Sequence, residues 1–157
     1  MYMIWVIISL IIVAIDQLTK FIVKNNIDYG RRIPVIDKFF YLTYHENTGA
    51  AWGLMQGGRM FFIPITIILI IFMGYYIYRS KNLLFKTALS FVIGGAIGNL
   101  IDRIRVGGVT DFLDFHFGSY NFPTFNAADS FIVIGTILLS YYILFVYKGN
   151  DLRGIGE

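Results

Sequence analysis

The chain has 157 residues, of which 57% are hydrophobic and 15% are charged, with a mean hydropathy of +0.66. Soluble domains are typically about 45–50% apolar and about 25% charged, so this composition excludes an ordinary soluble protein and predicts an integral membrane protein. The net charge of +3 comes from Lys and Arg residues dispersed at segment ends, which favours anionic lipid head groups over nucleic acid as partners.

Cysteine is absent, which excludes a disulfide framework, a thiolate metal site and a cysteine nucleophile. The two histidines, His45 and His116, lie far apart and have few ligand-type neighbours, so they do not indicate a metal site. The sequence contains no phosphate-binding glycine loop and no serine nucleophile elbow. Neither a metal ion nor an organic cofactor is predicted.

Four apolar segments follow one another along the chain, at residues 4–23, 61–78, 83–101 and 131–147. Each approaches the roughly 20 residues that a helix needs to cross the hydrocarbon core of a membrane. The first has no Lys or Arg before it and no cleavage pattern after it, so we expect a retained span rather than a secretory signal. The third contains Gly94 and Gly98, a spacing that lets helices approach closely, and should pack centrally. Residues 1–157 are expected to form a single all-α membrane domain with four transmembrane helices.

Two of the three connections are long, at residues 24–60 and 102–130, and four spans place both on the same side of the membrane. Positive charge near short connections marks the cytoplasmic side. The short connection, its flank and the C-terminal tail carry the basic residues Arg79, Lys81, Lys86, Lys148 and Arg153. We therefore expect both termini in the cytoplasm and both long connections outside.

Each long connection contains a stretch rich in aromatic and β-favouring residues, at residues 35–44 and 109–117. Such residues favour strands, and Phe and Tyr suit the interface between membrane and water. A small extracytoplasmic sheet on the membrane surface is predicted.

Asp111 and Asp129 stand out because ionisable residues at membrane depth are usually functional. If the two carboxyl groups converge from separate segments, they can perform acid–base catalysis on one water molecule. Asp129 has a structural alternative as the third residue of a helix capped by Asn126. Asp114 is an alternative second acid, ranked lower because its spacing of three residues from Asp111 does not define a shared geometry in an extended chain.

Polar residues near the ends of other segments are candidates to support such a site. Asp16 and Lys20 are spaced as neighbours on one face of a helix, either as a structural ion pair or as contacts to a substrate. Asn47, followed closely by Gly49, offers an amide that can bind a peptide backbone, or else a simple turn. These alternatives remain open at the level of the sequence.

The end of the third segment adds two further candidates. Asn99 lies within an apolar run, where a plain helix terminus does not explain it. Arg103 is adequately explained by the favourable position of a cation at a helix C-terminus, but an outward-facing Arg also binds carbonyl or anionic lipid groups well.

Three functions fit these residues: an enzyme that uses paired carboxylates, a small proton-coupled membrane transporter, and a structural subunit of an assembly. A transporter needs a continuous polar path, but the second and fourth segments are nearly free of polar residues towards the inner side. A structural subunit leaves the two aspartates unexplained. The enzyme is therefore preferred.

Five short motifs occur in order along the chain: Asp16-Gln17-x-Thr19-Lys20, Asn47-x-Gly49-Ala50-Ala51-Trp52, Gly98-Asn99-x-x-Asp102-Arg103, Val109-x-Asp111-Phe112 and Phe125-Asn126-x-Ala128-Asp129. Together they resemble the lipoprotein signal peptidase family, also called signal peptidase II, over essentially the whole chain. Any one motif is weak, but five in this order are highly specific. Trp52 stands where an aromatic residue, often Phe, is usual in the family.

The resemblance implies an aspartyl endopeptidase of the bacterial inner membrane that removes signal peptides from prolipoproteins, cutting before a Cys that carries diacylglycerol. Asp111 and Asp129 match the family's catalytic pair. The family residues that line the site are matched by Asn47, Asn99, Arg103 and Asn126. A family motif with a supporting role is matched by Asp16 and Lys20. The resemblance also implies an extracytoplasmic β-cradle, a short surface helix, an active site towards the outer face, and binding of globomycin-type inhibitors.

Overall fold

The computed structural model describes residues 3–49 and 55–147. This part of the chain contains four helices that are long and apolar enough to cross a membrane. They are α1 (Met3–Asn26), α2 (Arg59–Arg79), α3 (Leu83–Arg105) and α4 (Ala127–Tyr141), the last continuing into a π-helical turn, η2 (Tyr142–Val146). Large apolar side chains are exposed along α1, α2 and α4, as expected for helices that face lipid.

Helices α3 and α4 both extend beyond the apolar runs from which they are predicted, to Arg105 and back to Ala127. Helix α4 begins early because the Asn126 side chain accepts a hydrogen bond from the backbone N–H of Asp129. The Asp129 carboxylate in turn accepts one from the N–H of Asn126. The predicted cap is present, and it holds Asp129 in the first turn of the helix.

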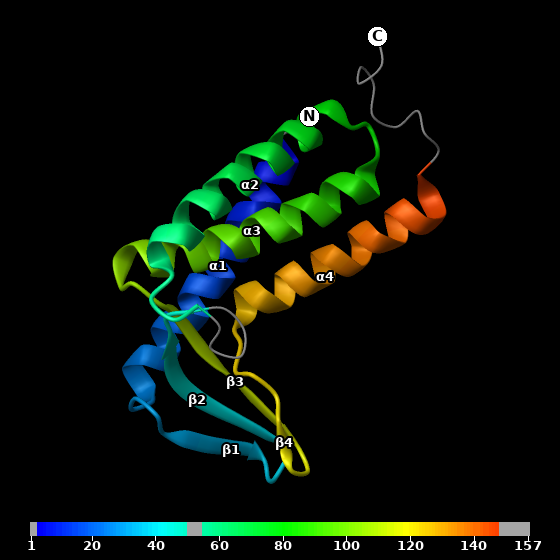
Figure 1. The fold of residues 1–157 in the computed structure, drawn as a ribbon. Coiled ribbons are helices and arrows are strands. Elements are labelled where there is room, and N and C mark those ends of the chain that lie inside the picture. Colours follow the sequence, from blue (N-terminus) through cyan, green and yellow to red (C-terminus); the bar gives the residue numbers. More distant parts are fainter. Residues whose placement is uncertain (1–2, 50–54, 148–157) are drawn as a thin grey trace.

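Helix α3 lies at the centre of the bundle and packs against the other three helices (Figure 1). Glycines on its surface allow this close packing. A Cβ atom at Gly94 would lie 2.8 Å from the Cβ of Ile12 on α1, and one at Gly95 would collide with the backbone of α4. Gly98 leaves room in the same way for the carboxylate of Asp16. The small residues therefore bring α1 and α4 against α3, as their spacing predicts.

The two long connections together form one antiparallel sheet with the strand order β1-β2-β3-β4. The strands are β1 (Arg32–Ile36), β2 (Phe40–Asn47), β3 (Val109–Phe117) and β4 (Tyr120–Asn121). Phe112 of β3 packs with Val23 and Ile27 at the end of α1, which anchors the sheet to the bundle. The pairing of β2 with β3 sets His45 opposite Asp111.

The sheet lies at one end of the helices, beyond the C-terminal end of α1 and the N-terminal end of α4 (Figure 1). The beginning of α1, the turn between α2 and α3, and η2 lie at the other end. In that turn the side chain of Asn82 caps α3 by accepting a hydrogen bond from the N–H of Phe85 at 3.1 Å. The architecture is thus four apolar helices with a small antiparallel sheet at one end.

The predicted all-α fold is corrected in one respect, because the described residues also form a four-stranded sheet. The predicted stretch 109–117 forms β3, but the stretch 35–44 is divided between two strands by a turn in which Lys38 has a φ of 60°. Between α1 and α2, and between α3 and α4, the described residues contain no separate short surface helix. Residues 50–54, which include the Ala50-Ala51-Trp52 part of the second motif, lie outside the described residues.

Candidate active site

Asp111 and Asp129 line the same cavity, which has a volume of about 600 Å³. Asp111 comes from β3 and is only 2% exposed, whereas Asp129 comes from the first turn of α4. Asn47, Asn99 and Arg103 share the cavity wall with them. Most of the remaining wall is apolar and includes Val109, Phe122, Pro123, Phe125, Ile132, Val133 and Ile134. The fold therefore brings two acids from separate segments to one largely apolar cavity.

Two asparagine side chains connect the carboxylates. Asn126 donates through Nδ2 to Asp111 Oδ1 at 2.7 Å and to Asn99 Oδ1 at 3.2 Å. Asn99 donates through Nδ2 to Asp129 Oδ1 at 2.7 Å. The Asn99 oxygen also accepts from the ammonium of Lys20, and the Asn126 oxygen accepts from a backbone N–H. Because these two groups can only donate, both amides are oriented with their NH₂ groups towards the acids.

Asn47 binds the second oxygen of Asp111. Its Nδ2 lies 3.2 Å from Asp111 Oδ2, and its Oδ1 accepts a hydrogen bond from the backbone N–H of Gly49 at 3.0 Å. The bond from Gly49 closes a local turn and directs the NH₂ group of Asn47 towards the acid. The turn, one of the two alternatives that the sequence leaves open for this motif, is present, and the binding of a peptide by the Asn47 amide stays a prediction.

Burial is the main reason why the pKa of Asp111 rises to about 7, and the charge of Asp129 adds to the effect. Hydrogen bonds from Asn126 and Asn47, and the charge of Lys20, act in the opposite direction. A carboxyl group with this pKa exists in both protonation states near neutral pH. Asp111 can therefore hold or accept a proton there, as acid–base catalysis requires.

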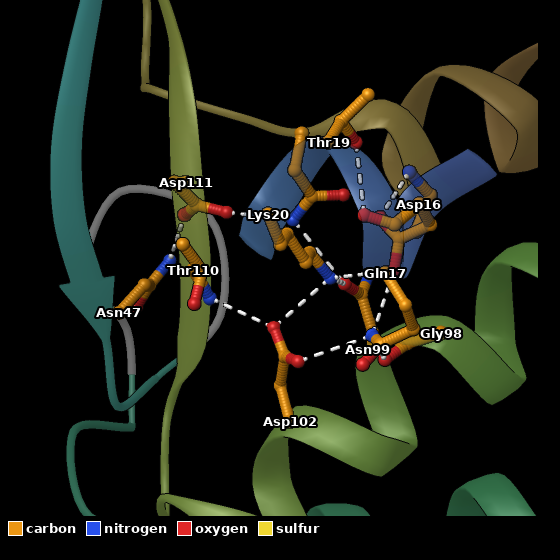
Figure 2. Close-up of polar contacts among 12 residues, drawn as sticks. Asp16, Gln17, Thr19, Lys20, Asn47, Gly98, Asn99, Asp102, Thr110 and Asp111 are labelled. Atoms are coloured by element: carbon orange, nitrogen blue, oxygen red, sulfur yellow. Dashed lines mark hydrogen bonds and ion pairs between the residues drawn. The ribbon is translucent and has the colours of Figure 1, made fainter. Parts of the chain in front are cut away.

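Lys20 is buried behind the cavity wall and binds three side chains (Figure 2). Its Nζ lies 2.9 Å from Asp16 Oδ2, 3.0 Å from Asp102 Oδ2 and 3.0 Å from Asn99 Oδ1. The predicted pair of Asp16 and Lys20 exists, but it is not the isolated pair at the membrane boundary that the sequence indicates. It belongs to a buried cluster, because Gly98 lets α1 and α3 come close enough for a second carboxylate to join.

The same cluster ties four elements together. Asp16 Oδ1 accepts from the backbone N–H of Ala128 on α4 at 3.0 Å. Asp102 Oδ2 accepts from the N–H of Thr110 on β3, also at 3.0 Å, and Gln17 donates to both carboxylates. Gln17 and Asp102 belong to the motifs quoted from the sequence, but neither is among the candidate site residues. A signal was present for Asp102, because it lies one helical turn after Asn99 and so shares a face with it.

Asp114, the alternative second acid, lies outside the cavity wall. Its Oδ2 is 2.9 Å from Arg32 Nε and its Oδ1 is 2.9 Å from His116 Nε2. Successive side chains of a strand point to opposite faces, so a spacing of three residues directs Asp114 and Asp111 to different sides of β3. The lower rank of Asp114 agrees with this geometry.

Arg103 reaches the cavity from the last turn of α3. Its guanidinium carbon lies 5.0 Å from the centroid of the Phe62 ring on α2, a cation–π contact that helps to hold the side chain in place. The residue therefore occupies a helix C-terminus, where the dipole favours a cation, and lines the cavity at the same time.

Residues 8–145 match the model of a protein family described as Signal peptidase (SPase) II. The chain belongs to the signal peptidase II family. A lipoprotein signal peptidase of Bacillus pumilus (strain SAFR-032) is 45% identical over 144 residues, which are 90% of this chain and 93% of that protein. One of Bacillus subtilis (strain 168) is 46% identical over 90% of this chain and 94% of that protein.

Solved structures agree with the family match. A bacterial membrane enzyme determined by the in meso method at 2.3 Å resolution has a TM-score of 0.83 and 40% identity, covering 89% of this chain and 87% of that one. A second, at 1.9 Å resolution, has a TM-score of 0.82 and 39% identity, covering 91% and 94%. The peptidase is thus a membrane protease that removes signal peptides from prolipoproteins, and the transporter and the structural subunit are set aside.

Proposed function

We propose that Asp111 and Asp129 are the catalytic pair of this protease. One observation carries the proposal: a buried carboxyl group, Asp111, and a partly buried one, Asp129, come from separate parts of the chain to line one cavity, and both oxygens of each accept hydrogen bonds. Two neighbouring carboxyl groups do not readily ionise together, so the pair shares one proton.

The shared proton defines the chemistry of the pair. The ionised carboxylate accepts a proton from water as the water oxygen attacks the scissile carbonyl, and the protonated carboxyl donates to the carbonyl oxygen. The peptide bond then breaks as the leaving nitrogen takes a proton from the pair. The reaction needs no metal ion or cofactor.

The surrounding residues hold this pair and receive the substrate. The three amides described above orient the carboxylates, and Gly49 and Arg103 contact the substrate from the cavity wall. Asp16 and Lys20 act from behind the wall, where Lys20 fixes the amide of Asn99. We assign them a supporting role rather than a contact with the substrate.

The substrate in this proposal is a prolipoprotein whose Cys already carries diacylglycerol, and the bond before that Cys is cut. The apolar wall along α4, from Ile132 to Ile134, is suited to acyl chains, which would place the bond beside the acids by a proximity effect. Globomycin-type inhibitors would occupy the same cavity.

Cleavage is expected to depend on the lipid. A diacylated precursor should be cut, whereas the same precursor without diacylglycerol should be cut hardly at all, because the acyl chains anchor the substrate by about 0.8 kcal/mol per buried methylene. The measurement compares kcat/KM for the two precursors with the purified peptidase. Equal kcat/KM values for the two precursors would still be consistent with a protease, but they would contradict positioning of the substrate by its lipid.

We further propose that the protein lies in the bacterial cytoplasmic membrane with both termini inside, and with the sheet and the cavity towards the outer face. The basic residues Arg79 and Lys81 support this orientation, because they lie at the end of the bundle that is opposite the sheet.

This topology can be tested in a chain that contains no native cysteine. Lys81→Cys and Ser119→Cys are both at exposed positions, whereas Ser80 is buried and would label poorly. An impermeant thiol reagent added to intact cells is expected to label the Cys at position 119 and to reach position 81 only after the membrane is opened. Labelling of both from one side would contradict the proposed arrangement.

A further inference from the structure

A second hollow adjoins the main cavity on the side of the sheet. It has a volume of about 360 Å³ and is lined by His45, Glu46, Asn47, Thr48, Gln56, Pro123 and Thr124. Asn47, Pro123 and Thr124 also line the main cavity, so the two spaces meet beside the amide that binds Asp111. The wall of the second hollow is mostly polar, whereas that of the main cavity is mostly apolar.

Glu46 is the acidic residue among the described residues that line this hollow. Its Oε1 accepts a hydrogen bond from the Tyr44 hydroxyl at 2.8 Å and lies 3.5 Å from Lys24 Nζ. Burial, together with the bond to Glu46, raises the pKa of Tyr44 to about 12, so the hydroxyl remains a donor at neutral pH. Lys24 is partly exposed and compensates the negative charge only in part, because water screens such pairs.

The position of the hollow indicates which part of a substrate enters it. A prolipoprotein has an apolar signal sequence, acyl chains on its Cys, and a polar mature chain that must leave towards water. The first two suit the apolar cavity beside α4. The hollow adjoins that cavity where β2 ends, and its wall is polar, so it suits the part of the mature chain that directly follows the Cys.

We propose that this hollow is the subsite for the side chain of the residue that directly follows the lipidated Cys, and that it favours a neutral polar or basic side chain over an acidic one. The proposal rests on the function proposed above. The Glu46 carboxylate attracts a cation and repels a carboxylate, while Thr48, Gln56 and His45 can exchange hydrogen bonds with an uncharged polar group.

The test uses three diacylated precursor peptides that differ only in the residue after the Cys, which is Ser, Lys or Asp. Cleavage by the wild-type protein is compared with that by Glu46→Gln and by the control Asp28→Asn. Gln keeps an oxygen that accepts from Tyr44. Asp28 is an exposed acid that pairs with Arg31 at 3.6 Å and is not part of the hollow's wall.

In the wild type, kcat/KM for the Ser and Lys peptides is expected to exceed that for the Asp peptide about two- to fivefold, as for a partly exposed charge. Glu46→Gln should abolish this preference, and Asp28→Asn should retain it. Equal values for the three peptides in the wild type, or an unchanged preference in Glu46→Gln, would overturn the subsite. If the wild type cleaved none of the peptides, the proposed substrate would fail instead, so the two failures are distinguishable.

Discussion

Asp111→Asn and Asp129→Asn are each expected to lower kcat for signal peptide cleavage by about 10³-fold. An amide can neither accept a proton from water nor share one with the partner acid. Because Asn has nearly the same shape as Asp, thermal unfolding in detergent should change much less than activity. The measurement is turnover of a diacylated precursor by each purified variant at saturating substrate.

The matched control is Asp114→Asn, which removes another buried acid from the same strand as Asp111. Asp114 binds Arg32 and His116 rather than lining the cavity. Its replacement should therefore lower the thermal stability of the protein but have only a small effect on kcat. Substantial turnover by Asp111→Asn or Asp129→Asn, above that of a mock purification, would show that the pair is wrongly assigned. A loss in Asp114→Asn as large as in these two variants would do the same.

Lys20→Met is expected to lower the free energy of unfolding by about 3–5 kcal/mol, because it leaves two buried carboxylates without their cation. Those carboxylates belong to Asp16 and Asp102, at 2.9 and 3.0 Å from Nζ. Cleavage should fall as well, since the amide of Asn99 loses the donor that orients it. Asp16→Asn should cost less, because Lys20 keeps Asp102. Thermal unfolding in detergent and cleavage are measured on the same samples.

The double variant Asp16→Asn with Lys20→Met should recover only part of the stability lost in Lys20→Met, because Asp102 remains unpaired. Lys24→Met is the matched control: its pair with Glu46 spans 3.5 Å and is partly exposed, so we expect a loss of less than about 1 kcal/mol. If Lys20→Met unfolds like the wild type while cleavage collapses, Lys20 acts on the substrate and its supporting role is wrong.

The helices and the local details of the site could largely be predicted from the sequence, since these depend on neighbouring residues. Apolar runs of membrane length indicate the helices, and the spacing of Asn126 and Asp129 predicts the cap that starts α4. The stretch 109–117 is read correctly as a strand. The common location of Asp111 and Asp129 was expected from motif order, which reflects the family rather than any local rule.

The rest could not be predicted, because it depends on contacts between segments that are distant in the chain. A spacing of four residues gives Lys20 one partner, Asp16, and nothing local shows that Asp102 approaches from α3. Likewise, the pairing of β2 with β3 joins two different connections, and composition does not show which residue of one lies opposite Asp111. The hollow lined by Glu46 depends on that pairing as well.

The bond between Ala128 on α4 and Asp16 on α1 joins the last span of the chain to the first. A ribosome synthesises these spans in order, so Lys20 and Asn99 are made before residues 126–129. Until then Asn99 lacks both Asn126 and Asp129, the partners that connect it to the two acids. On the proposed assignment, the protease becomes active only when its final helix inserts. A truncated chain without α4 would therefore be inactive and could not cleave other membrane proteins.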